Sequence, residues 1–262
     1  MDNLAKQAIG VFDSGVGGTS IWKEIHKLLP NENTIYLADS KNAPYGIKSK
    51  SAIRDLCVKN TDLLLEKGCK IIVVACNTAT TNAISFLREK YNVPFIGIEP
   101  AIKPATLNSK TKKVGILATK GTLSSELFLE TSSIYSKGIT LIEQHGSGIV
   151  ELIEGGKIDS KEMSTLLHYY LQPMIDANID YLVLGCSHYP YLKPQLELIL
   201  PDYVQIIDSG HAVARQTRAV LEANNLLNEQ SEYPEIQFFT NQNPTVLSEL
   251  IGKHYSITEL DF

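Results

Sequence analysis

The chain has 262 residues, 44% of them hydrophobic, and a formal net charge of −5. This length can bury a substantial core as one large domain or two smaller ones. A pI near 5.7, without a basic tract, argues against binding to nucleic acid. No apolar run approaches the roughly 20 residues that span a bilayer, and the polar stretch 1–8 does not resemble a signal peptide. We therefore expect a cytoplasmic protein with no membrane partner.

The first predicted strand, Ala8–Phe12, runs into the glycine-rich turn Asp13–Thr19 and then into a helix that ends at Pro30. The turn has no Lys-Ser/Thr pair as in a P-loop, and Ser20 stands where a dinucleotide fingerprint needs its third glycine. Tight packing or contact with a ligand could explain these glycines. Asp13 at the carboxyl end of the strand favours the ligand, because an unpaired acid is costly there.

Strands and helices alternate through the rest of the chain, which predicts an α/β fold with mostly parallel sheets and helices on both faces. The predicted strands cover residues 34–39, 70–75, 93–98, 112–118, 139–143, 181–185 and 205–208, and the longer predicted helices cover 49–67 and 160–178. The pattern restarts at Val114, where a strand again leads into a polar, glycine-containing turn. This repeat predicts two similar α/β domains related by duplication. We expect residues 1–98 and 210–262 to form the first domain and residues 99–209 the second, with the active site in the cleft between them.

The four cysteines divide into two kinds. Cys57 and Cys69 lie on or next to the apolar face of a predicted helix and are expected to fill the core. Cys76 and Cys186 each follow an apolar strand directly and precede a helix. In open α/β sheets ligands bind at such strand ends, and a helix N-terminus favours a thiolate over a thiol.

Asn77 and Thr78, which follow Cys76, are expected to cap the next helix. The two cysteines recur at nearly the same spacing as the two strand-and-turn units, so each predicted domain contributes one cysteine. Two thiols that face each other across a cleft could form a redox disulfide, bind a metal ion, or exchange protons with a substrate.

The neighbours of the two cysteines favour proton exchange. Redox pairs usually occur as C-x-x-C, which is absent here, and a metal site needs more ligands than His188 beside Cys186. Asp13 in the first half and His188 in the second could each orient a thiol and tune its pKa toward neutrality. Two such groups on opposite faces of one carbon are the machinery of a racemase or epimerase. No motif for pyridoxal phosphate or another cofactor is visible.

Five motifs occur in the same order as in a known family: Asp13-Ser-Gly-Val-Gly-Gly, Pro44-Tyr-Gly, Ala75-Cys-Asn-Thr-Ala, Gly97-Ile-Glu-Pro-Ala and Gly185-Cys-Ser-His-Tyr-Pro. Together they resemble the cofactor-independent glutamate racemases of bacterial cell-wall synthesis. The resemblance implies two-base interconversion of L- and D-glutamate, which supplies D-glutamate for peptidoglycan. It also implies a homodimer that needs neither a cofactor nor a metal ion.

The same resemblance implies roles for individual residues. The implied catalytic residues are Cys76, Cys186, Asp13, His188 and Glu154. The implied substrate-binding residues are Asp13, Ser14, Tyr45, Gly46, Asn77, Thr78, Thr119, Thr122, Ser187 and His188. By the same carry-over, Cys76 would act on D-glutamate and Cys186 on L-glutamate.

This chain departs from the family pattern at one position and is ambiguous at another. Ser187 replaces the usual threonine and keeps its hydroxyl, while Glu151 competes with Glu154 for the place of the assisting acid. Three other functions stay open from the sequence. They are a racemase for aspartate or another small acid, a decarboxylase that keeps only one of the two cysteines, and a non-catalytic protein that binds an acidic amino acid. Racemisation followed by circular dichroism would separate an enzyme from a binding protein.

Overall fold

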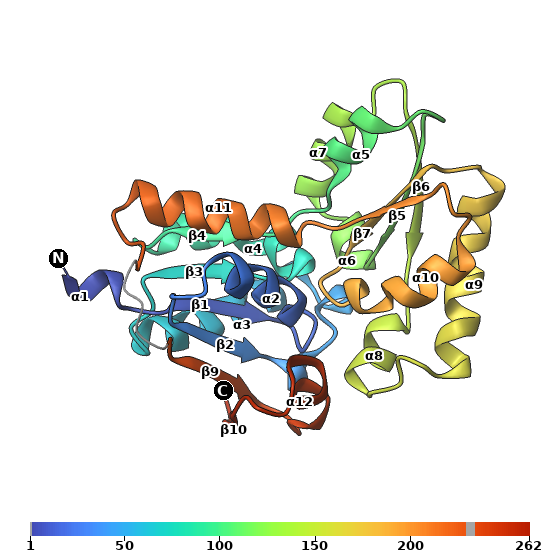
Figure 1. The fold of residues 1–262 in the computed structure, drawn as a ribbon. Coiled ribbons are helices and arrows are strands. Elements are labelled where there is room, and N and C mark those ends of the chain that lie inside the picture. The colour runs from blue at the N-terminus through green and yellow to red at the C-terminus, as the bar shows by residue number, and fades with distance from the viewer. Residues whose placement is uncertain (1, 229–233) are drawn as a thin grey trace.

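The computed structural model describes residues 2–228 and 234–262, and within them the strands form two parallel sheets (Figure 1). The first sheet has the order β10-β9-β2-β1-β3-β4, with β1 Ile9–Asp13, β2 Thr34–Ala38, β3 Ile71–Val74, β4 Phe95–Gly97, β9 Ile236–Thr240 and β10 Ile257–Glu259. The second has the order β6-β5-β7-β8, with β5 Lys113–Ala118, β6 Thr140–His145, β7 Tyr181–Gly185 and β8 Gln205–Ile207. We call each sheet with its helices a lobe. The predicted α/β fold with parallel sheets is confirmed.

Helices pack around both sheets (Figure 1). The first lobe contains α1 Asp2–Ala5, α2 Thr19–Leu28, η1 Ser40–Asn42, η2 Tyr45–Ile47, α3 Lys50–Glu66, α4 Asn77–Lys90, α11 Gly210–Ala223 and α12 Thr245–Ile251. The second contains α5 Ile102–Asn108, α6 Lys120–Leu123, α7 Glu126–Tyr135, α8 Ile149–Glu154, α9 Lys161–Asp176, η3 Tyr189–Leu192 and α10 Lys193–Ile199. Across the described residues, none of the helices has both the length and the apolar character needed to cross a membrane.

The central strands of the first sheet are buried on both faces, which explains why they read as continuous apolar runs. In β1, Val11 belongs to the core cluster that contains Trp22 of α2, whereas its neighbour Phe12 belongs to the cluster that contains Ile53 of α3. Successive side chains of a strand point to opposite faces, so β1 supplies both cores. Cys57 and Cys69 lie in the cluster of Phe12 and are buried, as expected for core cysteines.

The chain passes between the lobes twice, once after β4 and once after β8 (Figure 1). The two passages are joined by a hydrogen bond from Ser209 Oγ to the backbone oxygen of Glu99. Asp208 also pairs with Lys193 at 2.5 Å. After the second passage, β9 pairs with β2, so the last part of the chain returns to the first sheet.

Candidate active site

Cys76 lies at the carboxyl end of β3 and is 4% exposed. Its Sγ accepts a hydrogen bond from the backbone N–H of Ala79 at 3.4 Å and therefore caps helix α4 itself. The prediction that Asn77 and Thr78 cap this helix is wrong, because both lie inside its first turn. The cap falls on the cysteine because α4 begins directly after it, so its Sγ reaches the N–H three residues on.

Cys186 takes the corresponding place in the second lobe, directly after β7. It is 6% exposed, and its Sγ lies 3.8 Å from Nδ1 of His188. The charge of Cys186 contributes to the raised pKa of Cys76, so the two thiols are electrostatic neighbours although they come from different sheets. The structure therefore brings together the two cysteines that the sequence paired.

Burial raises the pKa of the Cys76 thiol well above its ordinary value, and the nearby Asp13 carboxylate raises it further. The Ala79 N–H and the Ser14 hydroxyl act in the opposite direction but do not outweigh burial. The N–H group at the helix N-terminus thus lowers this pKa, as expected, but burial outweighs it and the net shift is upward. Burial has the larger effect because it disfavours the charged thiolate relative to the neutral thiol.

Asp13 is fully buried at the end of β1 and is hydrogen-bonded to both lobes. Its Oδ2 accepts from the N–H of Gly15 at 3.0 Å, and its Oδ1 accepts from the hydroxyl of Ser187 at 3.0 Å. Burial raises the pKa of Asp13; the charge of His188 opposes this shift and that of Glu154 adds to it. A carboxyl with a raised pKa can hold a proton close to Cys76.

His188 is 1% exposed and its Nε2 lies 2.5 Å from Oε1 of Glu154. Burial by itself would lower the pKa of His188. Hydrogen bonds to Cys186 and Glu154, with the charges of Asp13 and Glu154, outweigh burial and raise this pKa well above its usual range. Glu151, the competing candidate, is exposed on the first turn of α8. The structure thus places Glu154, and not Glu151, against His188.

The glycine-rich turn fits tightly between the lobes. A methyl group on Gly15 would overlap the carboxylate of Glu154, and one on Gly17 would overlap the ring of His188. The hydroxyl of the buried Tyr36 holds the turn from its own sheet by donating to the carbonyl of Gly15 at 2.8 Å. Close packing between the lobes therefore accounts for Gly15 and Gly17 without a bound ligand.

The hydroxyls of Thr78, Thr119 and Thr122 form a cluster across the two lobes. Thr78 Oγ1 lies 2.7 Å from that of Thr119 and 3.2 Å from that of Thr122. Next to Thr78, Asn77 is 2% exposed, and within the described part of the chain neither its side-chain nitrogen nor its oxygen has a hydrogen-bond partner. Buried amides are normally paired, so Asn77 has free capacity for a polar ligand.

The other two candidate binding residues lie in the turn after β2. Tyr45 is buried, and its hydroxyl donates to Asp39 at 2.5 Å, so the phenol group is committed to the first lobe. A methyl group on Gly46 would overlap Thr119, which makes Gly46 a second point of close contact between the lobes. The two neighbouring residues therefore have different roles. Tyr45 fixes the turn to the first lobe, and Gly46 packs against the second lobe.

Two contacts of the site were not predicted from the sequence. The backbone N–H of Val16 donates to Oε1 of Glu154 at 2.7 Å, and the hydroxyl of Ser40 donates to its Oε2 at 2.8 Å. Ser40 directly follows the acid that ends the second predicted strand. Ser40 thus follows a strand end, as Asp13 and Cys76 do, and this position is the sequence signal that points to it.

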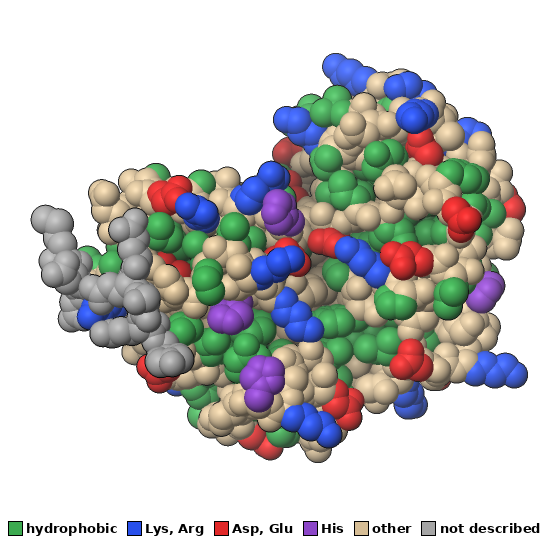
Figure 2. Space-filling view, viewed as in Figure 1, with side chains coloured by type: hydrophobic (Ala, Val, Ile, Leu, Met, Phe, Trp, Pro, Cys, Tyr) green, Lys and Arg blue, Asp and Glu red, His purple; other side chains and the backbone are tan. Residues whose placement is uncertain are grey.

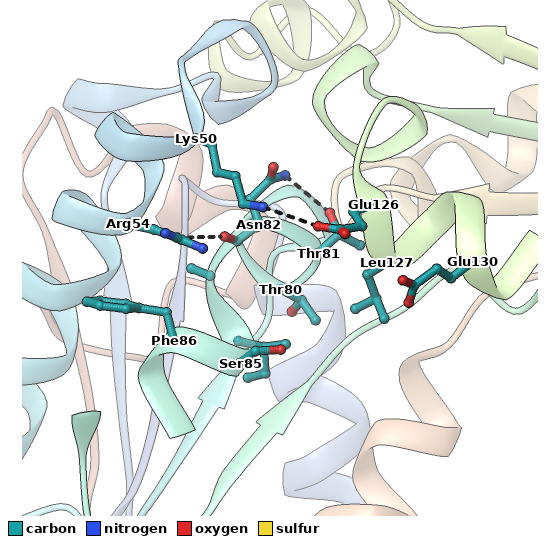
Figure 3. Close-up of a pocket in the computed structure, with 12 residues that line it drawn as sticks. Lys50, Arg54, Thr80, Thr81, Asn82, Ser85, Phe86, Glu126, Leu127 and Glu130 are labelled. Carbon is teal, nitrogen blue, oxygen red and sulfur yellow. Dashed lines mark hydrogen bonds and ion pairs between the residues drawn. The ribbon is translucent and has the colours of Figure 1, made fainter. Parts of the chain in front are cut away.

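A separate groove of about 270 Å³ lies between α3, α4 and α7 (Figure 3). Across it, Nζ of Lys50 lies 3.7 Å from Glu126, and the Asn82 side chain donates to the carbonyl of Gly121 at 3.1 Å. None of the candidate residues lines this groove.

On the face shown in Figure 2, charged side chains gather where the lobes meet. Among residues 2–228 and 234–262, the His, Cys, Asp and Glu side chains form no group of three that could hold a metal ion.

The sequence matches the family described as Asp/Glu/Hydantoin racemase over residues 9–217. It is 48% identical to a glutamate racemase of Ralstonia pickettii over 226 residues, which cover 86% of this chain and 80% of the relative. It is 42% identical to a glutamate racemase of Herpetosiphon aurantiacus, with 92% of this chain and 95% of the relative covered.

Solved structures give the same result. The glutamate racemase of Francisella tularensis in complex with D-glutamate superposes with a TM-score of 0.84 at 30% identity over 98% of each chain. The enzyme of Escherichia coli, in complex with L-glutamate and the activator UDP-MurNAc-Ala, gives 0.83 at 32% identity over 94% of each chain. The chain therefore belongs to the Asp/Glu/Hydantoin racemase family. Within it the chain groups with the glutamate racemases in both sequence and structure, and it is an amino-acid racemase.

Proposed function

We propose that the chain interconverts L- and D-glutamate by proton transfer between two cysteines, Cys76 and Cys186. The observation that carries this proposal is the arrangement of the two buried thiols, each at the carboxyl end of a strand in a different sheet. Each thiol also has an acid–base neighbour, Asp13 for Cys76 and His188 for Cys186. Such a pair can serve the two faces of one carbon centre.

The proton balance is simple in this scheme. With L-glutamate bound, the Cys186 thiolate takes the α-proton and the Cys76 thiol gives its proton to the opposite face. The product is D-glutamate, and the enzyme is left with Cys186 protonated and Cys76 ionised. D-glutamate runs the same steps in reverse. The raised pKa of Cys76, caused by burial and by Asp13, supports its role as the proton donor in the first direction.

The neighbouring groups would return each thiol to its working protonation state. Asp13, whose pKa burial raises, can take up or supply a proton beside Cys76. His188, held at 2.5 Å by Glu154, can do the same beside Cys186. The α-proton is only weakly acidic, so the site must also stabilise the carbanion through its carboxylate. Asn77 is the best-placed donor, because its buried amide has no partner within the described residues.

Substrate entry requires the lobes to separate. Both thiols and His188 are less than a tenth exposed, and Glu154 and Ser187 each form hydrogen bonds to the first lobe. We infer that the structure shows a closed form, in which water is excluded from the reacting groups. Closure of this kind strengthens the electrostatic interactions on which proton transfer depends.

We prefer glutamate to other substrates because the relatives that match 86% and 92% of this chain are named glutamate racemase. The presence of both cysteines disfavours a one-thiol decarboxylase.

A direct test follows the optical signal of L-glutamate by circular dichroism after dialysis against a chelator in reducing buffer. We expect the signal to fall to zero. An unchanged signal with glutamate, or a requirement for pyridoxal phosphate or zinc, would overturn the proposal.

We further propose the division into residues 1–98 with 210–262 and residues 99–209. The strand pairing supports it, because β9 joins β2 while β5 to β8 pair with one another. Limited proteolysis tests it, and cuts near 99 and 209 are expected.

We also propose a cytoplasmic homodimer that supplies D-glutamate for peptidoglycan. Sedimentation tests the dimer, and rescue of depleted cells by D-glutamate tests the supply.

A further inference from the structure

The carboxylate of Glu154 receives hydrogen bonds from both lobes. On Oε1 it contacts His188 of its own lobe at 2.5 Å and accepts from the N–H of Val16 in the first lobe at 2.7 Å. On Oε2 it accepts from the hydroxyl of Ser40, also in the first lobe, at 2.8 Å. The orientation of this carboxylate therefore depends on donors that the other lobe supplies.

Glu154 needs such support because of its position. It is the last residue of α8, and the chain continues directly into Gly155 and Gly156, the second of which has a φ of +68°. Its side chain is 14% exposed, and it has three rotatable bonds. Without the hydrogen bond from Ser40 to Oε2, the carboxylate of Glu154 could rotate and turn Oε1 away from His188.

Ser40 can provide this support because the turn that carries it is fixed. The N–H of the next residue, Lys41, donates to the Asn241 side chain at 2.9 Å. The Asn42 side chain donates to Asp39 at 2.7 Å. The turn is thus tied to β2 and to the end of β9, and Ser40 cannot follow Glu154 when the lobes separate.

We propose that Ser40 is a positioning residue that aligns Glu154 on His188 when the lobes close. The role rests on the proposed function, since it acts through Glu154 and His188 and touches neither the reacting carbon nor a thiol. The bond from Ser40 to Glu154 forms only in the closed arrangement. It therefore couples closure of the lobes to the correct placement of the acid–base pair beside Cys186.

The test compares Ser40→Ala with Ser40→Thr, which keeps a hydroxyl at the same position. We expect Ser40→Ala to lower kcat by about 3- to 10-fold in both directions, the range that corresponds to one hydrogen bond. KM should change by less than about twofold, because Ser40 does not hold the substrate. Ser40→Thr should restore most of kcat. The matched control is Ser124→Ala, which removes an exposed hydroxyl bonded to its own helix at Lys120 and should change neither constant.

A second arm repeats Ser40→Ala in a Glu154→Gln background. We expect Ser40→Ala to lower kcat by less than about twofold there, because the group that it aligns is already disabled. An unchanged kcat in Ser40→Ala, or a full further loss in the double variant, would overturn the proposal. A fall in melting temperature that Ser40→Thr does not reverse, with kcat unaffected, would also overturn it. Failure of the proposed function reads differently, since the wild-type protein would then not racemise glutamate, or a cysteine variant would keep full activity.

Discussion

The hydroxyl of Ser187, in the second lobe, donates to the buried carboxylate of Asp13, in the first, at 3.0 Å. Ser187 lies between Cys186 and His188 in the sequence, and Asp13 contributes to the raised pKa of Cys76. This single bond therefore joins the surroundings of one thiol to those of the other. The contact uses only the hydroxyl of Ser187, the group that the sequence analysis expected this residue to keep.

Each thiol should act as base toward one enantiomer. Removing either one must abolish racemisation, because the proton from the far face is lost. The remaining thiolate can still exchange the α-proton of its own enantiomer with solvent. We expect Cys186→Ala to exchange deuterium into D-glutamate and Cys76→Ala into L-glutamate, measured by proton NMR in heavy water. Full racemisation by either variant would rule out the two-base mechanism.

The Cys76 thiol should react slowly with alkylating agents at neutral pH. Burial and the Asp13 charge raise its pKa, so little thiolate is present. Asp13→Asn removes the charge, lowers this pKa and should speed alkylation by iodoacetamide at any given pH below it. Mass spectrometry of peptides can follow Cys76, with Cys69 as an internal control because burial raises its pKa to about 12. Equal rates in both proteins would contradict this assignment of cause.

A methyl group at position 17 should prevent the lobes from closing. In Gly17→Ala the methyl would overlap the ring of His188, and relieving such overlap typically costs about 1–3 kcal/mol. We expect kcat/KM to fall by roughly 10-fold or more, since about 1.4 kcal/mol corresponds to one factor of ten. Because the two enantiomers have equal energy, the loss must be the same for L- and D-glutamate. If Gly17→Ala kept wild-type kinetics, the lobes would close in spite of the added methyl group, and this prediction would be wrong.

His188 should stabilise the protein most strongly at low pH. Its pKa in the folded protein is raised by hydrogen bonds and by the charges of Asp13 and Glu154, against the opposing effect of burial. Its contribution is therefore fully present below the unfolded value near 6.5 and is lost as pH rises through the folded value. The difference in unfolding free energy between wild type and His188→Gln should be larger at pH 6 than at alkaline pH. The exposed His211→Gln serves as the control, and a difference independent of pH would refute this linkage.

Loss of a buried ion pair should lower the free energy of unfolding far more than loss of an exposed one. Glu32 and Lys70 are each 1% exposed and 2.5 Å apart, so Glu32→Gln leaves a buried ammonium without its partner. We expect a loss of about 3–5 kcal/mol of unfolding free energy. Glu126 and Lys50, which bridge the lobes in Figure 3, are at least half exposed, and Glu126→Gln should cost at most about 0.5 kcal/mol. Chemical denaturation of both variants measures the contrast, and equal losses would contradict it.

The sequence predicted most of the strands because those of parallel sheets are apolar throughout and end at polar residues. It also paired Cys76 with Cys186, since each follows such a predicted strand directly. It could not choose between Glu151 and Glu154. The two are one helical turn apart, and only the packing of α8 against His188 decides between them.

Other contacts depend on the three-dimensional arrangement of segments distant in sequence. The pKa of Cys76 could not be predicted because the degree of burial depends on how the second lobe closes over it. Ser40 and Val16 contact Glu154 across more than a hundred positions of chain. A local sequence pattern cannot show which distant residues come into contact, although the sequence does place Ser40 at a strand end.

The return of the chain to its first sheet has a consequence for synthesis on the ribosome. Strand β2 pairs on one side with β9, which lies about two hundred positions later. Until Ile236–Thr240 leaves the exit tunnel, the nascent first lobe presents β2 as an open edge, whose residues are all buried in the finished protein. Such an edge can pair with another chain. The second lobe, built from one continuous stretch, can complete its sheet earlier, so the lobe begun first is finished last, and chaperones would be needed most in that interval.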